Sequence, residues 1–447
     1  MRIFNSLTLS CLFSIVAAQT PNSVQFTRMD SLMVQDALQN HLQKDVSANY
    51  EYRLKAFTPN DSIKVLYELF LTDRQIDQIV YRKNMNIKRK VLNQIFSPIR
   101  NTPVSEKELN SSLESIKNAY SFMIDTPNYS WGNMDGKNGI VIDFIPSFKH
   151  QFSAIVGAKR HKNNSWEASG EIEINIENIF QNAESINLYW KKLDTLSQEI
   201  QFHFNQPHLF GTPIGVDISF DRNAIDGLFT ESISTFNMST RQRFVGVMSA
   251  GYEKSNIRAT ESGNNLGYLT HDVQSFVAKL KSTSMNSRWL PTNGYSYELA
   301  GKIGQIQKDL LYELLVKWNK IIPIKGPWFG RIAIWGQKIT SLGLSIPQSR
   351  YKRFGGMQTI KGFRENAFHS EWVLSPEIHS TYILNEHIHF SSFYQLGWFD
   401  ENISPIQSVG IGLKQMEDTS IIEIQYAVPL NAPISEGHLH FKYISRF

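Results

Sequence analysis

The residues with the clearest potential for chemistry lie in a glycine-rich segment late in the chain, residues 353–364. Its glycines are Gly355, Gly356 and Gly362. Glycine adopts backbone conformations that other residues rarely adopt, so we expect this segment to turn back on itself. The turn would present Lys361 and Arg364, whose side chains form charge-assisted hydrogen bonds with carboxylate or amide oxygens. The chemistry predicted here is the anchoring of a loop, not catalysis.

Two candidate partners for the loop follow from strand periodicity, because alternate residues of a strand point to the same face. One predicted face carries Ser375, Glu377 and His379, and a face of the next strand carries His389, Ser391, Phe393, Gln395 and Gly397. We expect Glu377 and Gln395 to point toward the loop. Lys361 cannot form the bidentate fork that arginine makes with a carboxylate, so Arg364 is a second candidate for that contact.

Other motifs with reactive residues are weak. Two His-x-His pairs, His387/His389 and His438/His440, each place two imidazoles on one strand face. Each pair either chelates a metal or lines a polar interior, and without a third ligand we expect no metal. The chain contains no nucleophile elbow, zinc-protease motif or Walker motif. We therefore expect neither an enzyme nor a cofactor, although sequence alone does not reveal a Ser/His pair of the kind used by lipid-hydrolysing barrels.

From residue 148 onward, apolar and polar residues alternate as in strands with one apolar and one wet face. In the last segment Leu439, Phe441, Tyr443 and Phe447 share one parity, and His438, His440 and Lys442 share the other. The polar face fits a hydrated lumen and the apolar face fits lipid. About 300 residues, at roughly 19 per strand and connection, give about 16 antiparallel strands, so the sequence predicts a transmembrane β-barrel of that size over 148–447.

The beginning of the chain has the features of an exported protein. Arg2 precedes an apolar stretch, and small residues come before Gln19, which predicts a signal peptide over 1–18. The only cysteine, Cys11, lies within it, so we expect no disulfide in the mature chain. No later apolar run approaches the roughly 18 residues that suggest a spanning helix. The formal net charge of +4 is too small to indicate a nucleic-acid partner.

Between the signal peptide and the barrel, mixed periodicities predict a soluble α+β region in two parts. In 19–73 we expect a helix after Asp30 and then two strands near 52–56 and 63–69. In 74–147 we expect a strand, two helices and two further strands. Basic residues near 82–90 and 159–162 either form solvated faces or contact anionic lipid head groups.

The glycine-rich segment resembles the sixth-loop signature of the outer-membrane assembly factor superfamily, which includes BamA, TamA and the two-partner secretion transporters. The usual signature is a Gly-Gly pair followed by Ile/Val-Arg-Gly-Tyr/Phe. The matching residues here are Gly355, Gly356, Ile360, Lys361, Gly362 and Phe363. Lys361 thus stands where the family usually has arginine, which implies a less rigidly held loop.

Further resemblance extends on both sides of the loop. Residues 372–382 resemble the strand that carries the family's acidic residue, here Glu377, and 390–398 resemble the next strand, where Gln395 replaces a common aspartate. The element order over 74–147 resembles a POTRA domain, and 19–73 resembles a second one truncated at its front. An unrelated α+β domain is the alternative. The terminal residues Phe441, Tyr443 and Phe447 resemble a barrel-assembly signal.

The resemblance implies a protein of the outer membrane of a Gram-negative-type bacterium, with its N-terminal region in the periplasm. It implies ATP-independent insertion or translocation of unfolded polypeptides, with outer-membrane lipids and accessory periplasmic or lipoprotein subunits as further partners. The short soluble region favours a specialised or accessory member. The alternatives are a dedicated secretion pore for one or a few exoproteins and a passive or lipid-handling barrel.

Overall fold

The structure is a computed structural model, and it describes residues 25–26, 49–58, 64–72, 74–82, 86–100, 103–104, 106–134, 137–160, 166–242, 245–306, 309–343, 345–399 and 404–446. The predicted signal peptide over 1–18, the helix expected after Asp30 and the terminal Phe447 lie outside the described residues.

The first described elements form small sheets. β1 (Gln25–Phe26), β2 (Asn49–Thr58) and β3 (Lys64–Thr72) form an antiparallel sheet in the order β1-β3-β2. β2 and β3 occupy the positions where two strands are expected. β4 (Arg74–Gln75) pairs with β6 (Pro103–Val104).

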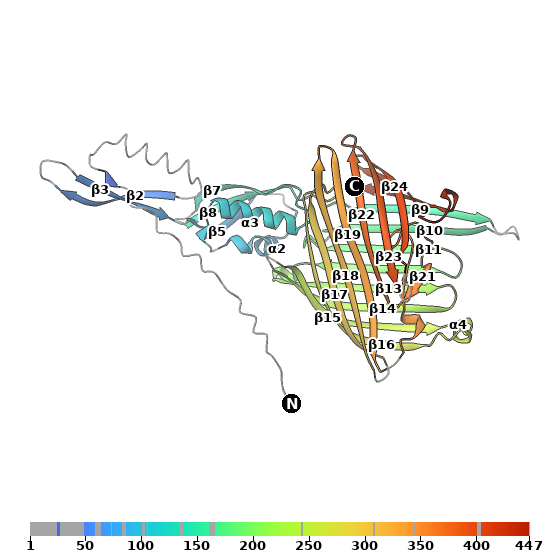
Figure 1. Cartoon of the computed structure of the whole chain (residues 1–447). Helices are drawn as coiled ribbons and strands as arrows, with labels where there is room; N and C mark the ends of the chain where they lie inside the picture. Colours follow the sequence, from blue (N-terminus) through green and yellow to red (C-terminus); the bar gives the residue numbers. More distant parts are fainter. Residues whose placement is uncertain are drawn as a thin grey trace, which may run out of the picture. The chain divides into compact units, whose positions relative to one another are not determined.

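The elements over 74–147 follow the order strand, helix, helix, strand, strand (Figure 1). They are β5 (Gln78–Tyr81), α2 (Arg89–Ile95), α3 (Glu106–Ala119), β7 (Asn128–Met134) and β8 (Lys137–Asp143), with a 3-10 turn η1 (Ser97–Ile99) after α2. The three strands form a sheet in the order β5-β8-β7. Apolar residues three or four positions apart, such as Leu109, Leu113 and Ile116 of α3, are buried, as an amphipathic helix requires. None of the helices in the described part of the chain is long and apolar enough to cross a bilayer.

Sixteen of the remaining strands close into a barrel in which every strand is antiparallel to both neighbours (Figure 1). They are β9 (Gln151–Arg160), β10 (Trp166–Glu177), β11 (Ser185–Lys192), β12 (Gln198–Gln206), β13 (Ile214–Ile225), β14 (Phe229–Gln242), β15 (Gly246–Ala259), β16 (His271–Met285), β17 (Gly294–Ile306), β18 (Asp309–Lys325), β19 (Trp328–Leu342), β22 (Trp372–Ile383), β23 (Ile388–Phe399), β24 (Ile406–Met416), β25 (Ser420–Pro429) and β26 (His438–Arg446). The prediction of 16 strands is confirmed.

Short elements occupy some of the connections. The hairpin β20 (Lys352–Phe354) and β21 (Phe368–Ser370) lies between β19 and β22, after the 3-10 turn η3 (Gln348–Arg350). The 3-10 turns η2 (Leu209–Gly211) and η4 (Ile434–Glu436) precede β13 and β26. A five-residue helix, α4 (Glu261–Asn265), joins β15 to β16 and departs from the strand-only expectation for 148–447. It forms because the Thr260 hydroxyl accepts a hydrogen bond from Gly263 N at 3.0 Å.

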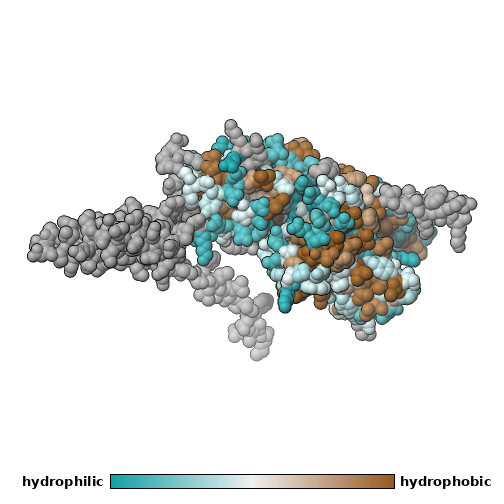
Figure 2. Space-filling view, turned by 90° about the horizontal axis from the view of Figure 1, so that it is seen from above, coloured by the Kyte–Doolittle hydropathy of each residue, from teal (hydrophilic) through white to brown (hydrophobic). Residues whose placement is uncertain are grey.

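The two faces of the barrel wall differ in polarity, as the alternation predicts. Exposed apolar side chains on the strands include Leu188, Ile218, Phe236, Phe276, Leu314, Ile378, Phe390 and Phe441. Buried polar side chains on the strands include Asn237, Glu253, Ser255, Ser275, Glu313, Glu377, Gln395 and Ser408. Figure 2 shows apolar side chains gathered on the barrel wall. The wall thus has the apolar outer surface that lipid requires and a polar lumen.

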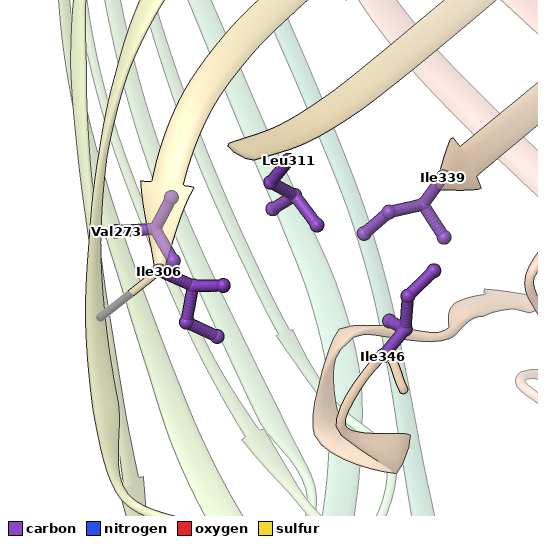
Figure 3. Packing of buried hydrophobic residues seen from close by; sticks show 5 residues of the cluster. All are labelled: Val273, Ile306, Leu311, Ile339 and Ile346. Carbon is purple, nitrogen blue, oxygen red and sulfur yellow. The ribbon is translucent and has the colours of Figure 1, made fainter. Parts of the chain in front are cut away.

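The barrel has two rims, which we name by the path of the chain. At the proximal rim β9 begins and β26 ends, and at the distal rim β9 ends and β26 begins. At the distal rim, Ile346 of the loop after β19 packs on strand residues that face the lumen (Figure 3). These residues are Val273, Ile306, Leu311 and Ile339. The start of this loop is therefore fixed by apolar packing.

The barrel closes at a seam between β26 and β9. Only three residue pairs join these two strands, Ile444–Ser153, Ser445–Phe152 and Arg446–Gln151. Every other neighbouring pair of barrel strands has between 8 and 15 paired residues. The three pairs lie at the proximal rim, so β9 and β26 present unpaired backbone groups toward the distal rim.

Candidate functional site

The glycine-rich segment lies in the long connection between β19 and β22, whose arms are β20 and β21. Gly355, Gly356 and Gly362 have φ angles of 114°, 92° and 84°, a region that favours glycine. Gly362 also makes a close approach to the wall, because a Cβ there would lie 3.1 Å from the carbonyl carbon of Val428 and 3.2 Å from Ser408 Cβ. The glycines thus let the loop turn and contact β24 and β25.

Hydrogen bonds within the loop hold this turn. Thr359 Oγ1 accepts from Gly355 N at 2.8 Å and donates to Gly355 O at 3.0 Å. Gly356 N donates to Ile360 O at 3.0 Å. Ile360 is fully buried in an apolar cluster with Phe354, Val373 and Phe399, and Phe363 packs against this cluster. The loop tip is therefore an ordered turn with its own core.

Lys361 joins the loop tip to the barrel wall. Its Nζ lies 2.5 Å from Glu377 Oε2 on β22 and 4.8 Å from the ring centre of Phe393 on β23. Its backbone N donates to Gln395 Oε1 at 3.0 Å. Lys361, Glu377 and Gln395 are all buried, so these contacts are screened little by solvent.

The side-chain amide of Gln395 binds the loop through both its nitrogen and its oxygen. Its Nε2 donates to Thr359 O at 2.6 Å and to Ser375 Oγ at 3.0 Å, while its Oε1 accepts from Lys361 N. An aspartate at this position could accept hydrogen bonds but could not donate to the Thr359 carbonyl. The uncharged amide of Gln395 therefore binds the loop backbone on both sides of Ile360, once as a donor and once as an acceptor.

Glu377 has a second cationic partner that strand periodicity does not indicate. Arg331 on β19 forms an ion pair with Glu377 and also contacts His379. Arg364, the sequence-based candidate for a forked contact, is exposed and makes no ion pair within the described residues. Arg331 sits opposite His379 in the β19–β22 register, so strand pairing could have found it. The arginine that pairs with Glu377 thus comes from the wall and not from the loop.

A second anchor holds the loop before the glycines. Arg350, in η3, is buried and donates to Glu313 Oε1 at 2.6 Å, Ser255 Oγ at 2.7 Å and Glu231 Oε1 at 3.1 Å. Lys352 Nζ lies 2.6 Å from Glu313 Oε2. These acceptors lie on β14, β15 and β18, whereas the Lys361 acceptors lie on β22 and β23. The loop therefore braces two separate parts of the wall.

Cavities remain beside both anchors. A lumen cavity of about 670 Å³ is lined by residues that include Arg331, Lys361, Glu377 and Gln395. A second of about 390 Å³ is lined by residues that include Glu231, Glu313 and Arg350. The braced loop therefore lines both cavities, which share Arg353 in their walls.

Two of the three residues predicted to form a barrel-assembly signal, Phe441 and Tyr443, lie on β26. Phe441 and Tyr443 are exposed on the apolar outer face, as their parity predicts. Phe447 lies outside the described residues. The structure thus places two of the three side chains on the outer face of the barrel wall.

The proximal rim contacts the helical region. Residues 79–98 and 112–131 belong to the same compact unit as 140–447. His208, beside η2, lies 2.7 Å from the hydroxyl of Tyr120, and its Nδ1 lies 3.1 Å from Thr212 O. Because the Thr212 carbonyl can only accept, Nδ1 carries the proton and Nε2 accepts from Tyr120.

Burial controls the protonation of this pair. It lowers the pKa of His208 to about 4 and raises the pKa of Tyr120 to about 12. The Arg241 guanidinium lies 4.8 Å from the Tyr120 ring centre, and its charge also disfavours a protonated His208. Both side chains are therefore neutral near pH 7, and the contact is a neutral hydrogen bond.

The His-x-His pairs do not assemble a metal site in the described part of the chain, where no group of three or more His, Cys, Asp or Glu side chains is suitably placed. His387 is exposed and contacts Met416 O, while His389 is buried in the lumen. The rings of His438 and His440 are 6.5 Å apart on β26.

The chain has the fold of a closed, antiparallel 16-stranded β-barrel, which solved structures of BamA and CdiB share. No protein-family model and no curated protein match the sequence. Solved structures that share the fold include one of BamA and two of CdiB. BamA from Haemophilus ducreyi lacking POTRA domains 1–3 is 13% identical with a TM-score of 0.53, and the match covers 94% of each chain.

The other two structures are of CdiB. CdiB from Acinetobacter baumannii is 12% identical with a TM-score of 0.59, over 92% of this chain and 81% of that one. CdiB from Escherichia coli is 11% identical with a TM-score of 0.60, over 93% of this chain and 84% of that one. The barrel fold that the loop signature led us to expect is thus shared with these three structures over more than 90% of this chain.

Proposed function

We propose that this protein is an ATP-independent insertase or translocase of polypeptides in the outer membrane, of the BamA/TamA type and specialised or accessory in role. The seam carries this proposal. A barrel that serves only as a pore gains nothing from a weak closure, whereas a barrel that exchanges strands with a client needs an edge that opens. The three residue pairs between β9 and β26 are the least extensive pairing in the described barrel.

Unpaired backbone groups at this seam would bind a client strand. A β-strand added to an exposed edge forms main-chain hydrogen bonds that do not depend on the client's side chains. Residues 154–160 of β9 and 438–443 of β26 have no partner across the seam in the described structure. The client's own folding free energy would drive the exchange, so no nucleotide or other cofactor is required.

The loop supports this function by keeping the rest of the barrel rigid. Its anchors at Arg350 and Lys361 hold five strands, β14, β15, β18, β22 and β23, that lie away from the seam. A rigid wall confines opening to the seam. In this arrangement the proximal rim faces the periplasm. A POTRA domain made of β5, β7, β8, α2 and α3 would receive clients there. Accessory subunits would dock on the same side.

A dedicated secretion pore for one or a few exoproteins is the second candidate. The similarity to the two CdiB structures favours this candidate, since their TM-scores of 0.59 and 0.60 are higher than the TM-score of 0.53 for BamA. The polar lumen would then be the path, and the braced loop would have to move. A passive or lipid-handling barrel is a third possibility, in which the seam stays closed.

The experiment is client insertion into vesicles with a lockable seam. The paired positions Ser153 and Ile444 are changed to cysteine in a Cys11→Ser background, and the purified full chain is reconstituted in lipid vesicles. A urea-unfolded small outer-membrane barrel protein is the probe. Insertion should stop when the disulfide is formed and resume on reduction. Insertion that continues with the seam locked would exclude the seam mechanism, and no insertion in either state would exclude the insertase function.

A further inference from the structure

The connection between β16 and β17 at the proximal rim is a preordered turn, residues 286–293. Asn286 organises it: its side chain donates to Thr292 Oγ1 at 2.7 Å and accepts from the backbone N of Thr292 at 2.9 Å and of Asn293 at 3.1 Å. Leu290 N donates to Ser287 Oγ at 3.2 Å. The turn thus has a defined conformation that presents Arg288 and Trp289.

Arg288 and Trp289 contact residues on both sides of the seam. The Arg288 guanidinium forms a two-pronged ion pair with Glu177, the last residue of β10. The centre of the Trp289 ring lies 4.9 Å from the Arg446 guanidinium at the end of β26. The backbone carbonyl of Trp289 accepts a hydrogen bond from Lys414 Nζ of β24 at 3.0 Å. One turn therefore touches the β9–β10 side through Glu177 and the β24–β26 side through Arg446 and Lys414.

The position of this turn in the ring makes these contacts informative. In the closed order that starts at β9, strands β16 and β17 are the eighth and ninth of sixteen, so they lie opposite the seam. The turn must reach across the lumen to make the contacts. Arg288 and Glu177 are 111 residues apart in the chain, and both side chains are largely buried. A forked Arg–carboxylate pair in such surroundings is geometrically specific.

The contacts also coincide with the strongest part of the seam. Its three residue pairs lie at the proximal rim, where Arg446 belongs to one of them and Glu177 ends the neighbouring strand β10. Glu177 further accepts from Lys149 N at 3.1 Å, which ties it to the segment that leads into β9. Farther along the lumen face, Lys442 of β26 bridges to Glu173 of β10 at 3.0 Å. Side-chain contacts therefore supplement a backbone ladder that is too short to close the barrel firmly.

We propose that the 286–293 turn is a latch that holds the seam closed at the proximal rim, with Arg288 and Trp289 as its positioning residues. The latch regulates the seam on which the proposed function rests. Release of the Arg288–Glu177 and Trp289–Arg446 contacts frees the β9–β10 hairpin from β26, and the remaining three-pair ladder then separates. A client or accessory subunit that competes for Glu177 or Arg446 opens the seam from the periplasmic side.

The test measures seam opening without any client. Ser153 is 4% exposed and pairs with Ile444, so a single cysteine at 153 in a Cys11→Ser background reports opening through its rate of reaction with a maleimide. The full chain in lipid vesicles is compared with Arg288→Gln/Trp289→Leu. Arg258→Ala is the matched control, because it removes an arginine from an exposed ion pair with Asp272 at the distal rim.

We expect the double variant to label about tenfold faster, which corresponds to about 1.4 kcal/mol of lost closure free energy. The Arg258→Ala control should label at the parent rate. Equal labelling rates in the double variant and the parent would overturn the latch. If the double variant fails to fold, Glu177→Gln replaces it, because the glutamine keeps an acceptor for Lys149 N but loses the charge that binds Arg288.

This measurement separates the latch from the proposed function. Faster labelling together with absent client insertion would support the latch and reject the insertase. Unchanged labelling together with normal insertion would reject the latch and leave the insertase standing. A folded Arg288→Lys variant should label at an intermediate rate, since lysine keeps the charge but not the fork.

Discussion

The Nζ of Lys361 lies 2.5 Å from the Oε2 of Glu377, so the tip of a loop that leaves β19 is bound to the strand that follows the loop. This ion pair is buried in the lumen and shares its carboxylate with Arg331. It is one of two anchors, and the other is Arg350 with Glu313.

Substitution of Lys361 with Ala should lower the free energy of unfolding by about 2 kcal/mol, the magnitude of a lost hydrogen bond to a charged group. The loss stays moderate because Arg331 still neutralises Glu377. The measurement is urea unfolding, in which the fraction of folded barrel is read from the gel mobility of the unheated protein. Lys317→Ala, which removes an exposed lysine paired with Glu298, is the control and should change little. Unchanged stability and full function of Lys361→Ala would remove the anchoring role.

Substitution of Arg350 with Ala should cost more, about 3–5 kcal/mol, because it breaks a buried network and leaves Glu231 and Ser255 without that partner. The same unfolding assay measures it. A double variant with Glu313→Gln should be less destabilised than the sum of the two single variants, since both changes remove the same pair. Additive losses would show that Arg350 and Glu313 do not act together.

Substitution of Gly362 with Ala should destabilise the loop tip by about 1–2 kcal/mol, because its φ of 84° is costly for an L side chain and the added Cβ meets β24 and β25 closely. Gly301→Ala is the matched control, since a Cβ there meets nothing within 4 Å. Proteolysis of the 343–371 loop reports local order. Equal cleavage of the two variants would argue against a strained, wall-contacting turn.

The contact between Tyr120 and His208 should weaken in acid. The folded-state pKa of His208, about 4, lies below its ordinary value of 6.5, so the neutral form is favoured on folding. Its stabilisation is complete above pH 6.5 and is lost as the pH falls toward 4. Hydrogen exchange of residues 120–123 at pH 7 and pH 4.5 measures this loss. His208→Gln should remove the pH dependence of the protection factors, which are corrected for the intrinsic exchange rate at each pH, and a variant that retained it would assign the effect to another group.

Deletion of Phe447 should impair insertion of the protein into its own membrane, because the terminal aromatic residue resembles a barrel-assembly signal. The level of folded, heat-modifiable barrel in cells reports the effect. Phe447→Tyr keeps an aromatic side chain and should behave as the parent. Normal levels of the deletion variant would contradict this role.

Much of the barrel could be predicted from the sequence because lipid and water impose a period of two on every strand. The same parity placed Glu377 and Gln395 in the lumen, and the glycines indicated a turn that brings Lys361 to them. The number of strands does not follow from this period, so it was predicted from the length of the chain. The weak seam, with its three-pair ladder, is visible only in the strand register.

Contacts across the lumen could not be predicted in this way. Arg350 is 119 residues from Glu231, and Arg288 is 111 residues from Glu177, and no periodicity relates such positions. Arg331 is an intermediate case, because its parity is visible but its pairing with β22 depends on the length of the loop between them. The sequence shows which face of a strand a residue occupies, whereas barrel closure decides what that face meets.

The most direct test of the proposed function is depletion of this protein followed by quantitative proteomics of purified outer membrane. An insertase of specialised role predicts the loss of a defined set of barrel proteins, with most others unchanged. Loss of one or two exported proteins alone would instead identify the dedicated secretion pore. An unchanged outer-membrane proteome, with the protein shown to be depleted, would contradict a role in handling polypeptides.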